Sequence, residues 1–270
     1  MNFPIRRLLL TGAAGGLGRV LRPRLKRHCH TLRLSDRAEL GTAAEGEELC
    51  PAALEDKRAI DALLQGVDAV VHLGGVSVEA AWEPIQAANI TGVFNLYEAA
   101  RHHGVRRIVF ASSNHVTGFY RQDEVIDALA PPKPDTLYGV SKAFGENLSR
   151  MYFERHGIET VCLRIGSATP KPETRRMLAT WLSHDDLERL VLAALTAPVV
   201  SHAIVFGMSA NGTRFWDNRL AAHIGYQPKD SSEPWRAELE AREPMPDPQD
   251  INTRYQGGVF VTLGPYDTFD

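Results

Sequence analysis

A glycine-rich segment near the start of the chain constrains the fold more than any other feature of the sequence. Residues 8–18 read LLLTGAAGGLG, so an apolar run leads through closely spaced glycines into a helical pattern. Gly12 permits a sharp turn, Gly15 lets backbone approach a pyrophosphate, and Gly18 lets the helix pack against the strand. The helix N-terminus offers unpaired N–H groups and a positive dipole, which suit phosphate groups. The segment therefore predicts a dinucleotide-binding strand–turn–helix unit.

An acidic residue at the end of the next apolar run supports this interpretation. Asp36 follows Gly18 by 18 residues, where its carboxylate can hydrogen-bond the adenosine ribose hydroxyls and repel a 2′-phosphate. Arg37 comes directly after it, and its guanidinium can either stack on adenine or offset part of that repulsion. The balance favours NAD over NADP as the cofactor.

Length and composition limit the class of protein. A chain of 270 residues, 44% hydrophobic and 23% charged, fits one large α/β domain or one domain with a small appendage. The net charge of −3, without a basic block, gives nucleic-acid binding no electrostatic support, and no apolar run approaches membrane length. The scattered Cys29, Cys50 and Cys162 are interpreted as free thiols. We predict a cytoplasmic protein and a homo-oligomer, with no nucleic-acid or membrane partner and no metal.

Strands and helices alternate along the first 165 residues. Apolar runs predict strands at 7–10, 31–35, near Leu49, at 107–113 and at 159–165, and a further strand from Asp68 into the glycine pair 74–75. Helical spacing predicts helices at 15–28, 56–65, 82–103 and 138–156. Residues 37–47 are expected to be loop with some helix. This alternation predicts an α/β protein with a doubly wound parallel sheet, the Rossmann arrangement.

The pattern loosens after Ile165. Helices are expected at 183–196 and 216–224, and short strands at 203–206 and 258–262. We predict an NAD-binding Rossmann domain at 1–166 and a small C-terminal substrate-binding lobe at 167–270, with 203–207 returning to the Rossmann sheet. The lobe is expected to lie over the carboxyl ends of the strands, where open α/β sheets bind ligands.

A tyrosine and a lysine four residues apart carry the predicted chemistry. Tyr138 and Lys142 share one face of a predicted helix. A free phenol titrates near pH ~10, too high for a base near neutral pH, but a nearby ammonium and an oxidised nicotinamide both favour the phenolate. Such a pair alone usually belongs to a solvated helix face. The glycine turn and the upstream Ser113 favour a catalytic role instead. We predict Tyr138 as the base, Lys142 as its partner and ribose contact, and Ser113 as the group that orients the substrate oxygen.

Together these features resemble the extended short-chain dehydrogenase/reductase superfamily. More specific runs resemble the uronate dehydrogenase family over nearly the whole chain: HLGGVSVE (72–79), FASSNHVTG (110–118), YGVSKAFGENLSRMYF (138–153), RIGSATP (164–170), RMLATW (176–181) and RYQGGVFV (254–261). The resemblance implies NAD-dependent oxidation of a hexuronate, D-glucuronate or D-galacturonate, at its anomeric carbon. The product would be the aldaro-lactone.

The resemblance also implies the residues of the site. The cofactor set is Gly12, Gly15, Gly16, Leu17, Gly18, Asp36, Arg37, Leu54, Leu73, Gly74, Gly75, Asn89, Tyr138 and Lys142. The sugar-acid set is Ser77, Ser113, Asn114, His115, Tyr138, Ser167, Arg176 and Phe260. A guanidinium such as that of Arg176 suits a planar carboxylate bidentately. Four of these side chains also have an ordinary alternative role. His115 and Asn114 could form a turn, Phe260 could pack in the core, and Arg176 could lie in a solvated loop.

One position departs from the family pattern. Ala53 stands where the family usually has an aspartate that contacts the adenine amine, so the adenine pocket must differ. Two other functions stay open. A nucleotide-sugar epimerase or dehydratase shares the fold and the Ser/Tyr/Lys set but usually needs a larger second lobe than residues 166–270 provide. A non-catalytic dinucleotide sensor typically loses the tyrosine or the lysine, and this chain keeps both.

Overall fold

The computed structural model describes residues 5–243, 245, 247, 249–264 and 266. Within these residues, seven parallel strands form one sheet in the order β3-β2-β1-β4-β5-β6-β9. The strands are β1 (Arg7–Thr11), β2 (Thr31–Ser35), β3 (Glu47–Leu49), β4 (Ala69–His72), β5 (Arg107–Ser113), β6 (Glu159–Ile165) and β9 (His202–Gly207). The doubly wound Rossmann-like fold predicted from the alternation is confirmed. The strand order reverses between β1 and β4, and this is where such sheets bind ligands.

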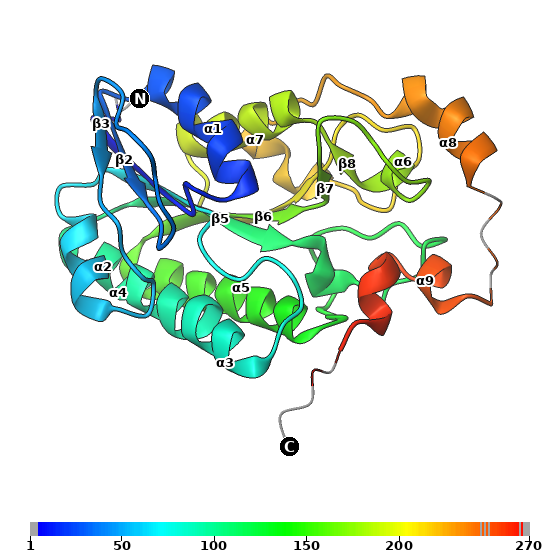
Figure 1. Cartoon of the computed structure of the whole chain (residues 1–270), viewed down its shortest axis with the longest axis horizontal. Helices are drawn as coiled ribbons and strands as arrows, with labels where there is room; N and C mark the ends of the chain where they lie inside the picture. Colours follow the sequence, from blue (N-terminus) through cyan, green and yellow to red (C-terminus); the bar gives the residue numbers. More distant parts are fainter. Residues whose placement is uncertain (1–4, 244, 246, 248, 265, 267–270) are drawn as a thin grey trace.

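Alternate residues of each central strand face opposite helical layers, which Figure 1 shows above and below the sheet. Leu8 and Leu10 pack in a cluster with residues of α1 (Gly16–Leu25) and α7 (His184–Thr196). Leu9 packs on the other side, in a cluster with residues of α2 (Lys57–Leu64), α4 (Gly92–His103) and α5 (Leu137–His156). Because both faces are covered, these strands are apolar throughout rather than alternating.

Two predicted helices are interrupted. The helix expected at 15–28 ends as α1 at Leu25 and continues as the 3₁₀ turn η1 (Lys26–His28), with Pro23 on its exposed side. The helix expected at 82–103 is α3 (Trp82–Ile85), the π-helical turn η2 (Gln86–Thr91) and then α4. Gly92, where the π turn ends, lies so close to another segment that an added Cβ would be 2.5 Å from the Leu54 Cβ. Such π turns occur often at functional sites.

The chain after β6 holds several short elements around one end of the sheet. They are β7 (Ser167–Ala168), α6 (Met177–Thr180), β8 (Trp181–Leu182), η4 (Arg219–Ile224), η5 (Glu233–Trp235), α8 (Arg236–Arg242), α9 (Ile251–Arg254) and η6 (Gly258–Thr262). Strands β7 and β8 pair with each other, whereas β9 pairs with β6 in the main sheet. Figure 1 shows α8 and α9 at the same end of the molecule, beyond β7 and β8.

Three local expectations are wrong. Residues 258–262 form the 3₁₀ helix η6 rather than a strand, because Gly258 turns the chain with a φ of +64° and Phe260 is used for a ring contact instead of sheet pairing. The helix expected at 216–224 begins only at Arg219, since Trp216 is buried against Phe206. No helix forms within residues 37–47, where bends and irregular chain lead through a turn at 45–46 into β3. Over the residues that the structure describes, no helix is both long and apolar enough to cross a membrane.

Candidate functional site

One cavity of about 1880 Å³ runs along the carboxyl ends of the central strands and joins the two predicted halves of the site. All the residues predicted to bind cofactor or substrate line it, with the single exception of Asn89. Its walls also include segments that the sequence did not suggest, among them Thr213, Phe215 and part of α8.

The glycine turn leaves no room for side chains at two of its positions. Gly12 has a φ of +69°, and an added Cβ would lie 2.7 Å from the Gly74 nitrogen. At Gly18 a Cβ would lie 2.1 Å from the Gly12 carbonyl oxygen, so α1 passes directly over the turn. Gly15 and Gly16 are exposed and line the cavity, so the start of α1 presents bare backbone there. This cradle fits the pyrophosphate of a dinucleotide.

Asp36 is held by the same turn. Its two carboxylate oxygens accept hydrogen bonds from the backbone N–H groups of Ala14 and Ala38, both at 3.0 Å. Asp36 and Arg37 both line the cavity, and Arg37 is exposed. The carboxylate is therefore fixed beside the turn with acceptor capacity left for a ribose hydroxyl.

The loop with the glycine pair Gly74–Gly75, which follows β4, is fixed by buried polar contacts. The Thr11 hydroxyl accepts from the Gly74 N–H at 3.2 Å and lies 2.7 Å from Nδ1 of His72. Burial lowers the pKa of His72 to about 3, so this imidazole is neutral near pH 7. Leu73, Gly74 and Gly75 themselves line the cavity, and so does Leu54.

Asn89 lies behind the loop that follows β4 rather than on the cavity wall. Its Oδ1 accepts from the Val76 N–H at 2.8 Å, and its Nδ2 donates to the Val76 oxygen and the Ser141 hydroxyl, both at 2.9 Å. These bonds tie the loop that carries Gly75 and Ser77 to the helix that carries Tyr138. Both Gly75 and Ser77 line the cavity.

Tyr138 and Lys142 lie in the first turns of α5, as the four-residue spacing predicts. The Thr136 hydroxyl caps this helix by accepting from the Gly139 N–H at 3.0 Å. The Tyr138 N–H donates to the buried Glu79 carboxylate at 2.8 Å. Sequence reasoning missed Glu79 as an anchor, because it lies 59 residues upstream of its partner.

Burial shapes the ionisation of both side chains. The pKa of Tyr138 is raised by burial, and the neighbouring Ser113 hydroxyl opposes part of this. Burial lowers the pKa of Lys142 to about 8, and its ammonium donates to the Ala111 oxygen at 2.8 Å. The Lys142 Nζ lies 5.6 Å from the centre of the Tyr138 ring. A phenol, an ammonium and a hydroxyl thus meet at one end of the cavity.

Arg176 lines the cavity, where it is half-buried, and it forms no ion pair with a carboxylate of the described residues. Its Nε donates to the Gln256 oxygen at 2.7 Å, and its Nη1 lies 3.5 Å from the Ser167 hydroxyl. In the side-chain orientation that satisfies both neighbours, the Asn114 amide oxygen accepts from Arg176 and its nitrogen donates to the Ile165 oxygen, each at 3.0 Å. Burial lowers the pKa of Arg176 to about 10, which still leaves it charged near pH 7.

The neighbouring Arg175 is engaged differently. Its backbone N–H donates to the Glu243 carboxylate at 2.6 Å, and its guanidinium donates to the Glu243 backbone oxygen at 3.3 Å and lies 3.8 Å from the Glu240 carboxylate. Of these two neighbouring arginines, Arg176 is therefore the one whose guanidinium forms no ion pair with a carboxylate of the described residues.

His115 and Phe260 come together from segments far apart in the chain. Their rings stack with centroids 3.8 Å apart, and the Tyr138 ring stands edge-on to His115 at 6.0 Å. His115 also pairs with Asp135, whose carboxylate is fully buried at 2.7 Å from Nδ1. Sequence reasoning missed Asp135 and Gln256; the run PDT just before the α5 pattern is the one local signal of Asp135.

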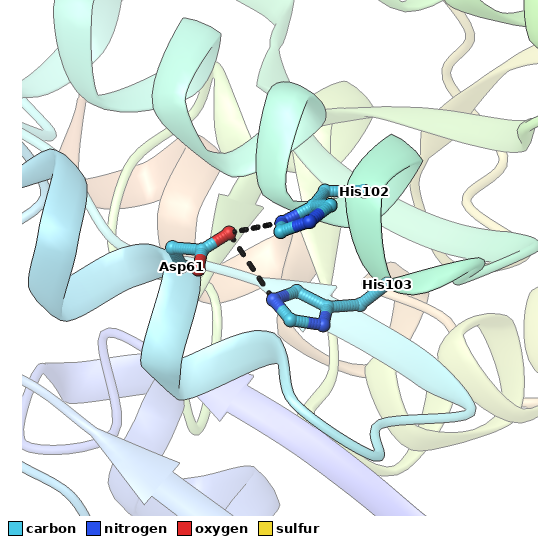
Figure 2. A group of neighbouring side chains, drawn as sticks. All are labelled: Asp61, His102 and His103. Carbon is cyan, nitrogen blue, oxygen red and sulfur yellow. Dashed lines mark hydrogen bonds and ion pairs between the residues drawn. The ribbon is translucent and has the colours of Figure 1, made fainter.

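One group of metal-competent side chains occurs in the part of the chain described, and it does not line the cavity (Figure 2). Asp61 of α2 accepts from Nδ1 of His102 at 2.7 Å and from Nε2 of His103 at 3.1 Å, both at the end of α4. These hydrogen bonds join the two helices on the outer layer.

Comparisons with known proteins agree with this geometry. The NAD dependent epimerase/dehydratase family model matches residues 8–199. A uronate dehydrogenase of Pseudomonas putida is 57% identical over 264 residues, which are 97% of this chain and 98% of that protein. A mutant uronate dehydrogenase of Agrobacterium tumefaciens, solved with NAD, superposes with a TM-score of 0.94 at 49% identity, over 97% of this chain and 99% of that one. The glucuronic acid dehydrogenase of Chromohalobacter salexigens has the same TM-score at 50% identity, over 96% and 98% of the two chains.

Proposed function

The chain belongs to the uronate dehydrogenase family of NAD-dependent oxidoreductases, within the extended short-chain dehydrogenases/reductases, and on that basis we propose its substrate, product and catalytic residues. The substrate is a hexuronate, D-glucuronate or D-galacturonate. The reaction oxidises C1 of the cyclic sugar acid and gives the aldaro-lactone. Residues 1–166 hold the cofactor and residues 167–270 complete the substrate pocket.

The observation that carries this proposal is the unpaired guanidinium of Arg176. Arg176 is half-buried in the cavity wall, and no carboxylate of the described residues forms an ion pair with it. A cation shielded from water without a counter-charge is unfavourable, so a site that keeps one is suited to an anionic ligand. Asn114 and Ser167 hold this guanidinium in place through the contacts described above. A uronate carboxylate would supply the missing counter-charge, whereas a neutral sugar would not.

The glycine cradle and Asp36 fit NAD. The turn at Gly12–Gly18 would receive the pyrophosphate on bare backbone, and Asp36 would accept from the adenosine ribose. Gly74 and Gly75 leave space beside them, and Lys142 would contact the second ribose. When bound, NAD⁺ supplies the acceptor for the hydride that leaves C1.

The proton chemistry belongs to Tyr138. As a phenolate it takes the proton of the anomeric hydroxyl while C1 loses hydride, so that the hemiacetal carbon becomes the lactone carbonyl. The Lys142 ammonium stabilises the phenolate electrostatically, since a nearby positive charge favours the ionised form of a phenol. The Ser113 hydroxyl, next to the phenol, orients the substrate oxygen.

An NADH absorbance assay with a panel of sugars tests the proposal. D-glucuronate and D-galacturonate are expected to reduce NAD⁺, and glucose and galactose are expected to react far more slowly. Turnover of a nucleotide sugar in place of the free uronates would favour an epimerase or dehydratase. Bound cofactor without turnover of any sugar would favour a dinucleotide sensor.

A further inference from the structure

The pairing of His115 with Asp135 has the geometry of an oriented imidazole. Nδ1 of His115 lies 2.7 Å from Oδ2 of Asp135, and the Asp135 carboxylate is fully buried. An ionised carboxylate only accepts hydrogen bonds, so Nδ1 must carry the proton in this contact. Nε2 has no hydrogen-bond partner in the parts of the chain described, and His115 lines the cavity. Nε2 is therefore the ring nitrogen left for a ligand.

The surroundings of Asp135 are built closely around its carboxylate. Its second oxygen accepts from the Thr136 hydroxyl at 3.0 Å. Two glycines pack against it, and an added Cβ would lie 1.8 Å from Oδ2 at Gly118 and 2.0 Å at Gly257. These two glycines are joined to each other, since the Gly257 N–H donates to the Gly118 oxygen at 2.9 Å. The carboxylate therefore has little freedom to turn away from the imidazole.

The surroundings of the His115 imidazole favour its neutral form over the protonated one. Burial lowers its pKa, the carboxylate of Asp135 opposes this, and the guanidinium of Arg176 adds to the lowering. The stacked Phe260 ring and the edge-on Tyr138 ring surround the remaining faces of the imidazole. A neutral imidazole with its proton on Nδ1 presents a lone pair at Nε2, which can only accept a hydrogen bond.

We propose that Asp135 is a positioning residue that keeps the proton of His115 on Nδ1, so that Nε2 accepts a hydrogen bond from a ring hydroxyl of the sugar acid. This inference rests on the proposed uronate substrate. It gives the two polar walls of the pocket distinct tasks: Arg176 recognises the carboxylate, and His115 recognises a hydroxyl. With the proton on Nε2 instead, the imidazole would donate, and it would lose the acceptor that a hydroxyl hydrogen needs.

A double-mutant cycle separates this role from a purely structural one. The four proteins are wild type, Asp135→Asn, His115→Phe and the double variant, compared by kcat and KM for D-glucuronate and by Kd for NAD⁺. An asparagine in place of Asp135 keeps the shape but can also donate, so it no longer fixes the tautomer. We expect Asp135→Asn to lower kcat/KM about tenfold or more without changing the NAD⁺ affinity. In the His115→Phe background the same change is expected to alter kcat/KM less than about twofold.

An equal loss from Asp135→Asn in both backgrounds would show that Asp135 acts on the fold and not through His115, and no loss in wild type would also overturn the proposal. A direct measurement does not depend on the folding of Asp135→Asn. Nitrogen-15 NMR of histidine-labelled wild type, with the His115 signals assigned by their absence in His115→Phe, is expected to show the Nδ1–H tautomer. The Nε2–H tautomer would overturn the proposal. Because this readout needs no turnover, it is independent of whether uronates prove to be the substrates.

Discussion

The dinucleotide end of the cavity is formed by segments close together in the sequence, whereas the substrate end is assembled from residues far apart. Seven consecutive residues, Gly12–Gly18, form the cradle, and Asp36 reaches back only 22 residues to Ala14. At the other end, Arg176 is held by the Gln256 carbonyl 80 residues downstream, and Gln256 in turn donates to the Arg121 oxygen 135 residues upstream. The first end depends on the shape of the backbone, and the second on the charge and direction of side chains. Substitutions that add atoms should therefore weaken the dinucleotide end, and substitutions that remove polar groups should weaken the substrate end.

Tyr138 stands where the two ends meet, and its removal should have the largest effect. We expect Tyr138→Phe to lower kcat for D-glucuronate by about a hundredfold or more, because a positioned acid–base group typically contributes that much. NAD⁺ affinity should stay within a few-fold, since the cradle is untouched. Stopped-flow kinetics and cofactor titration measure both. Tyr266→Phe, at an exposed position, is the control and should behave as wild type. Normal turnover by a folded Tyr138→Phe protein would remove this residue from the mechanism.

Loss of the guanidinium should affect the substrate end alone. Hydrogen bonds to charged groups contribute about 1.5–3 kcal/mol, so Arg176→Ala should lower kcat/KM for D-glucuronate by roughly one to two orders of magnitude. Glucose has no carboxylate, so its slow oxidation should hardly change. Arg176→Lys should recover only part of the loss, because an ammonium lacks the planar fork.

The adjacent arginine provides the matched control for this test. The Arg175 guanidinium donates to the Glu243 backbone oxygen at 3.3 Å and lies 3.8 Å from the Glu240 carboxylate, so Arg175→Ala should leave the preference for uronate over glucose unchanged. Equal losses for both sugars in Arg176→Ala would make Arg176 a structural residue. The carboxylate would then have to be held by another donor, and the Arg175→Ala variant tests Arg175 as the next candidate.

Sequence was informative where a pattern is local. The glycine turn, the alternation of strands and helices and the spacing of Tyr138 and Lys142 each occupy one short stretch, and each determines a backbone shape directly. The fold class followed from them. The strand expected at 258–262 failed for the opposite reason. Its few apolar residues do not indicate which part of the chain they pack against, and Phe260 packs against the His115 ring instead of pairing in a sheet.

The missed residues all act across long distances in the chain. Glu79 accepts from Tyr138, Asp135 fixes His115, and the Gln256 carbonyl holds Arg176. Each is a common residue type with several possible roles, and only the tertiary structure selects one. Asn89 shows the same limit from the other side: its position was predicted to contact cofactor, but its side chain is occupied by the loop after β4.

Two glycines two residues apart test the dependence of the dinucleotide end on backbone shape. Gly18→Ala would place a Cβ 2.1 Å from the Gly12 oxygen, whereas Gly16→Ala meets nothing within 4 Å. Overpacking of this kind costs about 1–3 kcal/mol, so Gly18→Ala should lower the free energy of unfolding by that amount and weaken NAD⁺ binding about tenfold. Gly16→Ala, at the start of α1, should leave the free energy of unfolding unchanged or slightly raised. Urea denaturation and cofactor titration compare them. Equal stability of the two variants would show that the turn relaxes easily.

At Asp36 the dinucleotide end depends on a side-chain charge as well as on backbone shape, and replacement of this residue should have the smallest effect. The carboxylate is already engaged by Ala14 and Ala38, and it is partly exposed, so solvent screens its charge.

Asp36→Asn keeps the shape but exchanges a charged acceptor for a neutral one, a loss of about 1 kcal/mol or roughly fivefold in kcat/KM for NAD⁺. The same change removes the repulsion of a 2′-phosphate, so kcat/KM for NADP⁺ should rise severalfold and the preference for NAD⁺ should narrow. Asp56→Asn is the control, because Asp56 also accepts from two backbone N–H groups, at 3.0 and 3.1 Å, at the start of α2 and does not line the cavity. It should lower stability without changing the cofactor ratio. If Asp36→Asn leaves that ratio unaltered, the cofactor preference does not come from the charge of Asp36 but from the shape of the turn or from Arg37.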